Sequence, residues 1–289
     1  MSSNRTKITL LVDNGPFLES GTPPSGGVTN LATEHGLSMW IEHGDNRILL
    51  DTGQGPALEP NAAALGIDLS QTDILALSHG HYDHTGGVDR LLALAPTTQV
   101  YCHPSVTNDR YAVREGRSDF IGMPKSPLHA LRHLQAGQIN WVTGPTSLVN
   151  DVSLTGPVPR LTDYEDTGGP FYQDDAGWRP DPLEDDLALW IGTREGLVIC
   201  FGCAHSGAVN TLDYVRTLAP HTPIRAIIGG LHLNSASEER LQRTAEALRA
   251  LDIPDIVPCH CTGAKAAQTF AEALGERVRA GGPGTTMEF

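Results

Sequence analysis

The sequence predicts an α/β protein whose first part is rich in β-strands, and two patterns carry this prediction. In the first quarter, short apolar runs follow one another with turn residues between them. In the second half, similar runs alternate with longer segments of helical periodicity. A chain of 289 residues with 39% hydrophobic residues can bury a substantial core, and we expect one domain over residues 1–289.

Four strands are expected in the first quarter of the chain. They cover residues 8–13, 37–42, 47–51 and 73–77. Asp45-Asn46 supplies a hairpin turn between the second and third, so we expect a β-meander at the front. A helix over 56–65 is closed by a glycine, a second over 88–95 stops before a proline, and a short strand covers 99–101.

The segment 104–182 carries little regular patterning. Residues 128–134 hold one or two helical turns, and residues 148–154 read as a strand. The stretch 155–182 is rich in Gly, Pro and Asp, and irregular stretches of this length are usually mobile or functional. We expect 104–182 to be an irregular insertion or lid, and removal of 165–178 to change substrate selection without removing metal.

Strands and helices alternate again from residue 186 onward. The expected strands cover 187–191, 197–201, 224–228 and 255–257, the helices 208–218, 238–251 and 264–274, and a short strand ends the chain. Three histidines, His205, His232 and His260, follow strands and have Gly or Cys beside them. Sheets covered by helices carry their binding residues at strand ends, so the polar chemistry should collect along one edge.

The densest group of metal-ligand residues follows the fourth strand. Residues 77–87 read Leu-Ser-His-Gly-His-Tyr-Asp-His-Thr-Gly-Gly, which places His79, His81, Asp83 and His84 within six residues. Imidazole nitrogen and carboxylate oxygen suit zinc and its first-row neighbours. These positions are too close for one helix face, so we expect a tight turn around one or two cations. A solvated histidine-rich loop is the alternative.

Composition excludes several classes of partner. Asp plus Glu number 34 against 20 Lys plus Arg, a formal charge of −14, so nucleic acid is not expected and a small molecule is the expected substrate. No apolar stretch reaches the roughly 18 residues of a membrane span. The five cysteines are odd in number and no export signal precedes the first strand, which favours a reducing cytoplasm. The oligomeric state stays open.

The segment from His79 to His84 matches the His-x-His-x-Asp-His motif of the metallo-β-lactamase superfamily. Five further segments resemble one group of metal-dependent hydrolases in it, the group that includes the archaeal dihydropterin-ribofuranosylaminobenzene 5'-phosphate synthases. They are residues 34–38, 48–53, 202–210, 229–233 and 260–263. The similarity runs from about residue 8 to the C-terminus and is weakest over 105–180. It implies a four-layer αββα metallo-β-lactamase sandwich.

The resemblance also implies two divalent metal ions, with zinc favoured and manganese or iron as alternatives. Their ligands would be His79, His81 and His205 for one ion, and Asp83, His84 and His260 for the other. Asp51 resembles the aspartate that braces the metal turn by hydrogen bonds, and such residues tune metal affinity. A plain turn-capping role is the alternative for Asp51. His232 is either a catalytic residue of the site or part of the substrate wall.

One departure from the superfamily pattern affects the ligand that would bridge the two ions. Many members carry Gly-His before the second strand pair and Asp after it, whereas this chain has an acidic run at 184–186 and Cys203 at those places. The bridging ligand therefore stays open between Asp186, Cys203 and water alone. An acidic run is often a solvated turn, and a buried cysteine at a strand end is often structural.

Metal-assisted hydrolysis of a small anionic metabolite is the function predicted first. Zinc-bound water titrates at about pH 7, and Asp83 would orient it. The alternatives are a pterin-conjugate synthase, oxygen chemistry at a manganese or iron pair, and a non-enzymatic metal-dependent binding or sensing protein. Glu34 and His35 either face the cleft or cap local structure. Six aromatic residues either stack a planar ring or pack: Trp40, Tyr82, Tyr164, Phe171, Tyr172 and Trp178.

Overall fold

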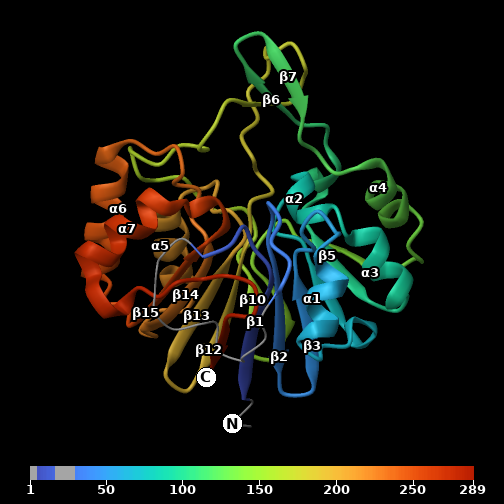
Figure 1. The fold of residues 1–289 in the computed structure, drawn as a ribbon, viewed down its shortest axis with the longest axis horizontal. Helices are drawn as coiled ribbons and strands as arrows, with labels where there is room; N and C mark the ends of the chain where they lie inside the picture. Colours follow the sequence, from blue (N-terminus) through green and yellow to red (C-terminus); the bar gives the residue numbers. More distant parts are fainter. Residues whose placement is uncertain (1–4, 17–29) are drawn as a thin grey trace.

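Two β-sheets lie face to face between two groups of helices (Figure 1). A computed structural model describes residues 5–16 and 30–289 of the chain. The expectation that no export signal precedes the first strand concerns residues 1–4 among others, and these four lie outside the described residues.

The first sheet has seven strands in the order β16-β1-β2-β3-β4-β5-β8. Their bounds are β1 Thr6–Val12, β2 Ser38–His43, β3 Asn46–Leu50, β4 Ile74–Ala76, β5 Gln99–Cys102, β8 Ile139–Trp141 and β16 Thr286–Glu288. The expected meander is correct for β1, β2 and β3, which pair antiparallel, but wrong for β4, which is parallel to β3. A parallel strand needs a crossover, and helix α1 (Leu58–Ala64) lies in this connection.

The second sheet has six strands in the order β15-β14-β13-β12-β10-β9. Their bounds are β9 Thr146–Val149, β10 Val152–Leu154, β12 Ala188–Thr193, β13 Gly196–Phe201, β14 Ile224–Gly230 and β15 Asp255–Cys259. Strands β13, β14 and β15 are parallel, so their C-terminal ends lie at the same edge. The loops after these three strands carry the later histidines of the sequence.

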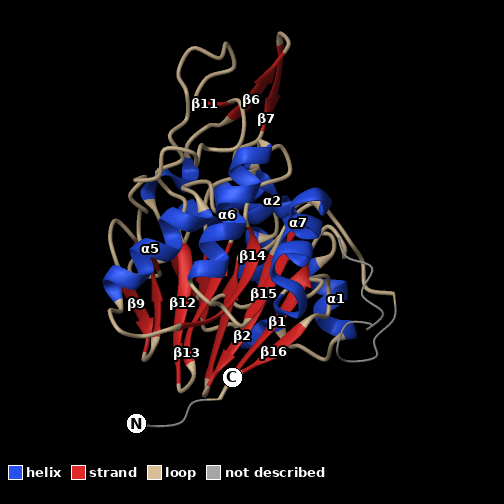
Figure 2. Ribbon diagram, turned by 90° about the vertical axis from the view of Figure 1, so that its left-hand side faces the viewer, coloured by secondary structure: helices blue, strands red, loops and turns tan. Residues whose placement is uncertain are grey.

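Helices cover the outer face of each sheet (Figure 1, Figure 2). The first sheet is covered by α1, α3 (Val88–Leu94) and α4 (Lys125–Arg132), and the second by α5 (Ala208–Leu218), α6 (Glu238–Ala250) and α7 (Ala264–Leu274). Buried side chains of both sheets, such as Ile41, Leu50, Leu189 and Ile228, form one core between them. The expected αββα sandwich is confirmed. Short 3-10 helices lie at Leu69–Gln71, Pro104–Thr107, His260–Thr262 and Gly275–Arg277.

The segment 104–182 contains more regular structure than the sequence predicts. Helix α4 and strands β8, β9 and β10 belong to the sandwich, and the strand expected at 148–154 is a hairpin of β9 and β10. Strands β6 (Tyr111–Arg114), β7 (Arg117–Phe120) and β11 (Phe171–Tyr172) form a separate sheet. This small sheet projects above the edge of the sandwich (Figure 1, Figure 2). Its strands are short, β7 is exposed throughout and β6 is only partly buried, so neither has the alternation of buried and exposed residues that marks a strand in a sequence.

No helix in the described ranges has both the length and the apolar character needed to cross a lipid bilayer.

Candidate metal centre

The loop after β4 carries the first four predicted ligands. His79 and His81 lie in the non-helical part of the loop, and Asp83 and His84 lie in the short helix α2 (Tyr82–Thr85). The expected tight turn is therefore found at His79 to His81, and a single helical turn follows it at Tyr82–Thr85. All four side chains are buried. Gly80 allows this turn to pack tightly, because a Cβ there would lie 2.4 Å from the carbonyl oxygen of Val106.

The structure brings His205 and His260 to this loop from the ends of β13 and β15. The donor atoms of His79, His81 and His205 all lie within 4.8 Å of one another. On the other side, Nε2 of His260 lies 3.2 Å from Nε2 of His84 and 3.4 Å from Oδ2 of Asp83. The structure thus brings all six residues together, and their division between two ions stays a prediction.

Hydrogen bonds from outside the cluster fix the orientation of four histidine rings. Nδ1 of His79 lies 2.9 Å from Ser78 Oγ, and Nδ1 of His84 lies 2.7 Å from Asp51 Oδ2. Nδ1 of His205 lies 2.8 Å from the carbonyl oxygen of Thr167, and Nδ1 of His260 lies 2.9 Å from Asn14 Oδ1. Metal-binding histidines usually engage an oxygen or water through their other ring nitrogen. Each ring consequently presents Nε2 to its neighbours in the cluster.

Some histidine ring nitrogens of the cluster are buried without a hydrogen-bond partner among the described residues. They include Nε2 of His81 and Nε2 of His205. Burial lowers the pKa of His79, His81 and His205 well below the usual value, so these rings are neutral and able to bind a cation. A tetrahedral zinc ion places its nitrogen ligands roughly 3.3 Å apart. The 3.2 Å between His84 and His260 fits that requirement.

Carboxylates stabilise positive charge at His84. Burial by itself would lower the pKa of His84, but Asp51 and Asp83 beside it raise this pKa to about 9. Burial would conversely raise the pKa of Asp83, and His84 with His35 holds it well below the usual range. The same carboxylates would stabilise a metal cation, so the donor set fits divalent ions.

Asp51 lies beneath the loop that carries His79 to His84 and contacts this segment at Ser78 and at His84. Its Oδ1 accepts a hydrogen bond from the backbone N–H of Ser78 at 2.7 Å. Its Oδ2 lies 2.6 Å from Ser78 Oγ and 2.7 Å from Nδ1 of His84. This is the position of a bracing residue, and its effect on metal binding stays a prediction.

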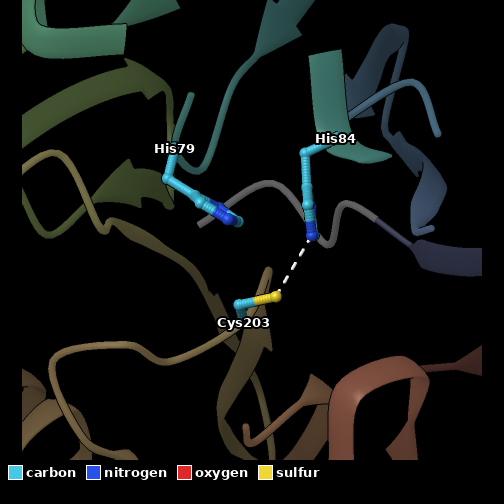
Figure 3. A group of neighbouring side chains, drawn as sticks. All are labelled: His79, His84 and Cys203. Carbon is cyan, nitrogen blue, oxygen red and sulfur yellow. Dashed lines mark hydrogen bonds between the residues drawn. The ribbon is translucent and has the colours of Figure 1, made fainter. Parts of the chain in front are cut away.

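Cys203 lies between residues of the two donor groups (Figure 3). Its Sγ is 3.1 Å from Nε2 of His84 and belongs to one donor group with His79 and His84. Asp186 has a different position, because its Oδ2 accepts a hydrogen bond from the backbone of Ser206 at 2.7 Å. None of the donor groups formed by the described residues includes Asp186. The geometry therefore favours Cys203 over Asp186 as the protein atom between the two groups.

The remaining predicted residues divide between the pocket and the scaffold. His232 lines the pocket, and its ring centroid lies 4.1 Å from that of His205. His35 also faces the pocket, with Nε2 at 3.1 Å from Oδ2 of Asp83. Glu34 instead accepts hydrogen bonds from the backbone of Gln54 and Ala57, so it stabilises local structure. Cys261, which the sequence interpretation did not select, lies with its Sγ 3.2 Å from that of Cys203.

A pocket of about 810 Å³ opens over the donor groups. Of the six aromatic residues considered from the sequence, Tyr82 and Phe171 line it. Trp40 is buried in the core, the ring of Tyr164 lies under Arg243, and Trp178 is 85% exposed. Phe120 and Arg114 also line the pocket, and they were missed because the hairpin of β6 and β7 was not recognised.

The first part of the expected lid is fixed against the loop that carries His205. Nη1 of Arg160 donates a hydrogen bond to the carbonyl of His205 at 2.6 Å. Glu165 accepts hydrogen bonds from the backbone N–H groups of Val209 and Asn210 at the start of α5. Together with the Thr167 contact to His205, these bonds make residues 160–167 part of the scaffold of the site.

Comparisons with known proteins identify the family and the fold. Residues 32–260 match the family model described as the metallo-β-lactamase superfamily. A protein of Methanocaldococcus jannaschii named 7,8-dihydropterin-6-methyl-4-(beta-D-ribofuranosyl)-aminobenzene-5'-phosphate synthase is 31% identical over 266 residues, which cover 86% of this chain and 89% of that protein. An uncharacterised protein of the same organism is 30% identical over 260 residues, which cover 90% and 91%.

Two solved structures have the same fold. A metal-dependent hydrolase of the β-lactamase superfamily superposes with a TM-score of 0.80 and 26% identity, covering 98% of this chain and 99% of that one. A metallo-β-lactamase fold protein from Bacillus subtilis gives a TM-score of 0.57 at 11% identity, covering 99% and 100%, which shows the fold alone. Because the family model spans most of the chain and the ligand motif lies where the two sheets open onto a pocket, the chain belongs to the metallo-β-lactamase superfamily.

Proposed function

We propose that this protein is a metal-dependent hydrolase of a small anionic metabolite. It would hold two divalent ions, with zinc favoured. One ion would be bound by His79, His81 and His205, and the other by Asp83, His84 and His260. The observation that carries the proposal is the gathering of these six residues beside one pocket, which His81, Asp83 and His260 line. Nε2 of His81 and Nε2 of His205 are buried and unpartnered among the described residues. We expect the enzyme to work in a reducing cytoplasm, where its five unpaired cysteines stay reduced.

When bound, such ions lower the pKa of a coordinated water and polarise the oxygen of the group under attack. The chain's own residues supply the rest of the chemistry. Asp83 accepts hydrogen bonds on the pocket side, and His35, 3.1 Å from it, orients its carboxylate. His232 lies at the other side of the donor groups, where it can donate or accept a proton at the substrate.

The pocket walls favour a substrate with an anionic group and a planar ring. Arg114 is the single Lys or Arg among the described residues that line the pocket. A guanidinium group binds phosphate or carboxylate in two-point contacts. Tyr82, Phe120 and Phe171 supply aromatic surface on which a planar ring can stack.

A pterin-conjugate synthase is the second candidate function. It is favoured by the 31% identity to the Methanocaldococcus jannaschii synthase, whose name describes a pterin joined to a ribofuranosyl-aminobenzene phosphate. The same site would then assist displacement of a leaving group by an aromatic acceptor instead of by water. The aromatic pocket wall suits either reaction, because both substrates would contain a planar ring.

Metal content and product analysis test these proposals together. Metal-replete protein is first analysed for bound zinc, manganese and iron, and we expect two ions per chain. It is then incubated with phosphate esters, diphosphate esters and lactones in water labelled with oxygen-18, with and without an arylamine acceptor. Mass spectrometry reports whether the product carries the label.

The outcomes separate the candidates. Label in the product supports hydrolysis, whereas an unlabelled conjugate formed only with the arylamine supports the synthase. Two bound ions without turnover of any compound would favour a binding or sensing protein. Less than one ion per chain would contradict the metal-dependent site itself.

A further inference from the structure

A buried cluster of charges lies directly behind the metal-binding loop. Arg110 is 1% exposed, and its Nη2 lies 2.7 Å from Oδ1 of Asp185. Its Nε lies 3.4 Å from Oδ2 of Asp181, and Nη2 also donates to the carbonyl of Ser105 at 3.1 Å. Both carboxylates are buried, so one guanidinium joins two segments that are far apart in the sequence, residues 105–110 and 181–185.

Asp185 connects this cluster to the ligands. Its second oxygen, Oδ2, accepts a hydrogen bond from the backbone N–H of Gly80 at 2.8 Å. Gly80 lies between His79 and His81, and the backbone N–H of Leu187, two residues after Asp185, donates to the carbonyl of Ser78 at 2.9 Å. The segment that contains Asp185 is therefore hydrogen-bonded to the loop at Ser78 and at Gly80, the residue between His79 and His81.

Arg110 connects the same cluster to the pocket wall. It directly precedes β6, in which Ala112 and Arg114 line the pocket. The backbone N–H of Asp181 donates to the carbonyl of Phe171 at 2.9 Å, and Phe171 also lines the pocket. The two walls above the donor groups and the loop beneath them thus meet at one buried ion cluster.

We propose that Arg110 and Asp185 are positioning residues that set the spacing of His79 and His81 and tie this pair to the pocket wall. The inference rests on the proposed metal-dependent function. Asp185 acts through the Gly80 peptide and touches neither ion nor substrate. One member of the acidic run at 184–186, Asp185, thus supports the loop through this hydrogen bond.

The geometry explains why a carboxylate and a guanidinium are needed here. Asp185 uses one oxygen for Arg110 and the other for Gly80, and an asparagine would direct its NH2 group at one of these donors. Arg110 reaches two carboxylates and a carbonyl from one planar group, which the single ammonium of a lysine does not reproduce.

Cobalt and zinc titrations of the full chain test the inference. The wild type, Asp185→Asn and Arg110→Lys are titrated in competition with a chromophoric chelator, and the visible absorption of bound Co²⁺ reports ligand geometry. We expect Asp185→Asn to bind one ion like the wild type and the second about 10- to 100-fold more weakly, with an altered Co²⁺ spectrum. Arg110→Lys should show a smaller change of the same kind.

Asp255→Asn is the matched control. Asp255 also pairs with an arginine, Arg225, but it lies at the start of β15, away from the donor groups. This substitution should lower the thermal midpoint without changing either metal affinity. If Asp185→Asn does not fold, the double substitution Arg110→Gln with Asp185→Asn removes both charges together and is titrated instead.

The results separate failure of the inference from failure of the proposed function. If the wild type binds two ions and folded Asp185→Asn, or the double variant, keeps both affinities and the Co²⁺ spectrum, the residues only stabilise the fold and the inference is wrong. If the wild type itself binds no ion, the metal-dependent function is wrong before the variants are compared.

Discussion

Each histidine at the candidate metal centre depends on a different neighbour for its orientation. Asp51 holds His84, Thr167 holds His205 and Asn14 holds His260, and these partners come from distant parts of the chain. Because a neutral imidazole has one donor and one acceptor nitrogen, a bond to one nitrogen determines what the other can bind. We therefore expect the affinity of the proposed centre for metal to depend on residues that would not touch the ion.

At the scale of one residue, Asp51→Asn should weaken metal binding about 10- to 100-fold. The carboxylate contacts Ser78 and His84 through both oxygens, and an asparagine loses one of these contacts. Competition with a chelator measures the affinity. Asp45→Asn, in the exposed turn between β2 and β3, is the control and should leave the affinity unchanged. Equal affinities for wild type and Asp51→Asn would mean that Asp51 only caps its turn.

A second prediction at this scale concerns Cys203, whose Sγ lies 3.1 Å from His84. With Co²⁺ bound, the wild type should show a near-ultraviolet band from thiolate-to-metal charge transfer, and Cys203→Ser should lack it. Cys200→Ser is the control, because Cys200 lies in the core between the sheets. A band that persists in Cys203→Ser would assign the thiolate ligand to another residue or leave Cys203 structural.

At the scale of elements, the small sheet of β6, β7 and β11 forms one wall of the pocket, and the sandwich supplies the donor groups. Strand β6 places Arg114 toward the pocket, while its partner in the pairing register, Arg117, forms an ion pair with Asp119. Two arginines that face each other across a hairpin therefore have different surroundings. This difference makes them a matched pair for experiment.

Replacement of Arg114 by alanine should raise the Michaelis constant for an anionic substrate about tenfold, with kcat little changed. The loss corresponds to about 1.5 kcal/mol, the lower end for a hydrogen bond to a charged group. Arg117→Ala removes the same charge outside the pocket and should leave the constant unchanged. If both substitutions act alike, the effect is long-range electrostatics and Arg114 does not contact the substrate.

The lid segment leads to a prediction that corrects the one made from sequence. Removal of residues 165–178 was expected to leave metal bound, but it deletes Thr167, whose carbonyl orients His205. We now expect this deletion to weaken metal binding. The shorter deletion of 174–178 should leave metal content unchanged, because Trp178 is exposed and none of these residues lines the pocket. Elemental analysis of both variants distinguishes the two results.

At the scale of the whole molecule, the metal site and the cores are separate. Three clusters of buried apolar residues hold the four layers together, and none of them includes a proposed ligand. Loops at strand ends can change without loss of the scaffold behind them. The fold should therefore not depend on metal in the way that a zinc finger does.

Removal of metal should accordingly lower the thermal midpoint without unfolding the protein at room temperature. A ligand present at about 100 times its dissociation constant stabilises the folded state by about 2.7 kcal/mol, and this contribution is lost in chelator. Asp83→Ala and His84→Ala should abolish turnover and keep the far-ultraviolet circular dichroism spectrum. Joint loss of activity and spectrum would show that the ions are structural.

The sequence alone determined the features that depend on neighbours along the chain. The donors His79, His81, Asp83 and His84 lie within six residues, and most strands and helices follow from apolar spacing. The four-layer arrangement and the assignment of His205 and His260 as expected ligands came from resemblance to a family. Local periodicity carries no information about which strand ends meet.

The tertiary structure decided the contacts between distant segments. Asn14 meets His260 across 246 positions, and Asp185 meets Gly80 across 105. The positions of Asp186 and Cys203 relative to the donor groups also depend on how the loops after β4 and β13 are packed. Such contacts are made when two sheets close on a shared core, and no spacing within one segment encodes them.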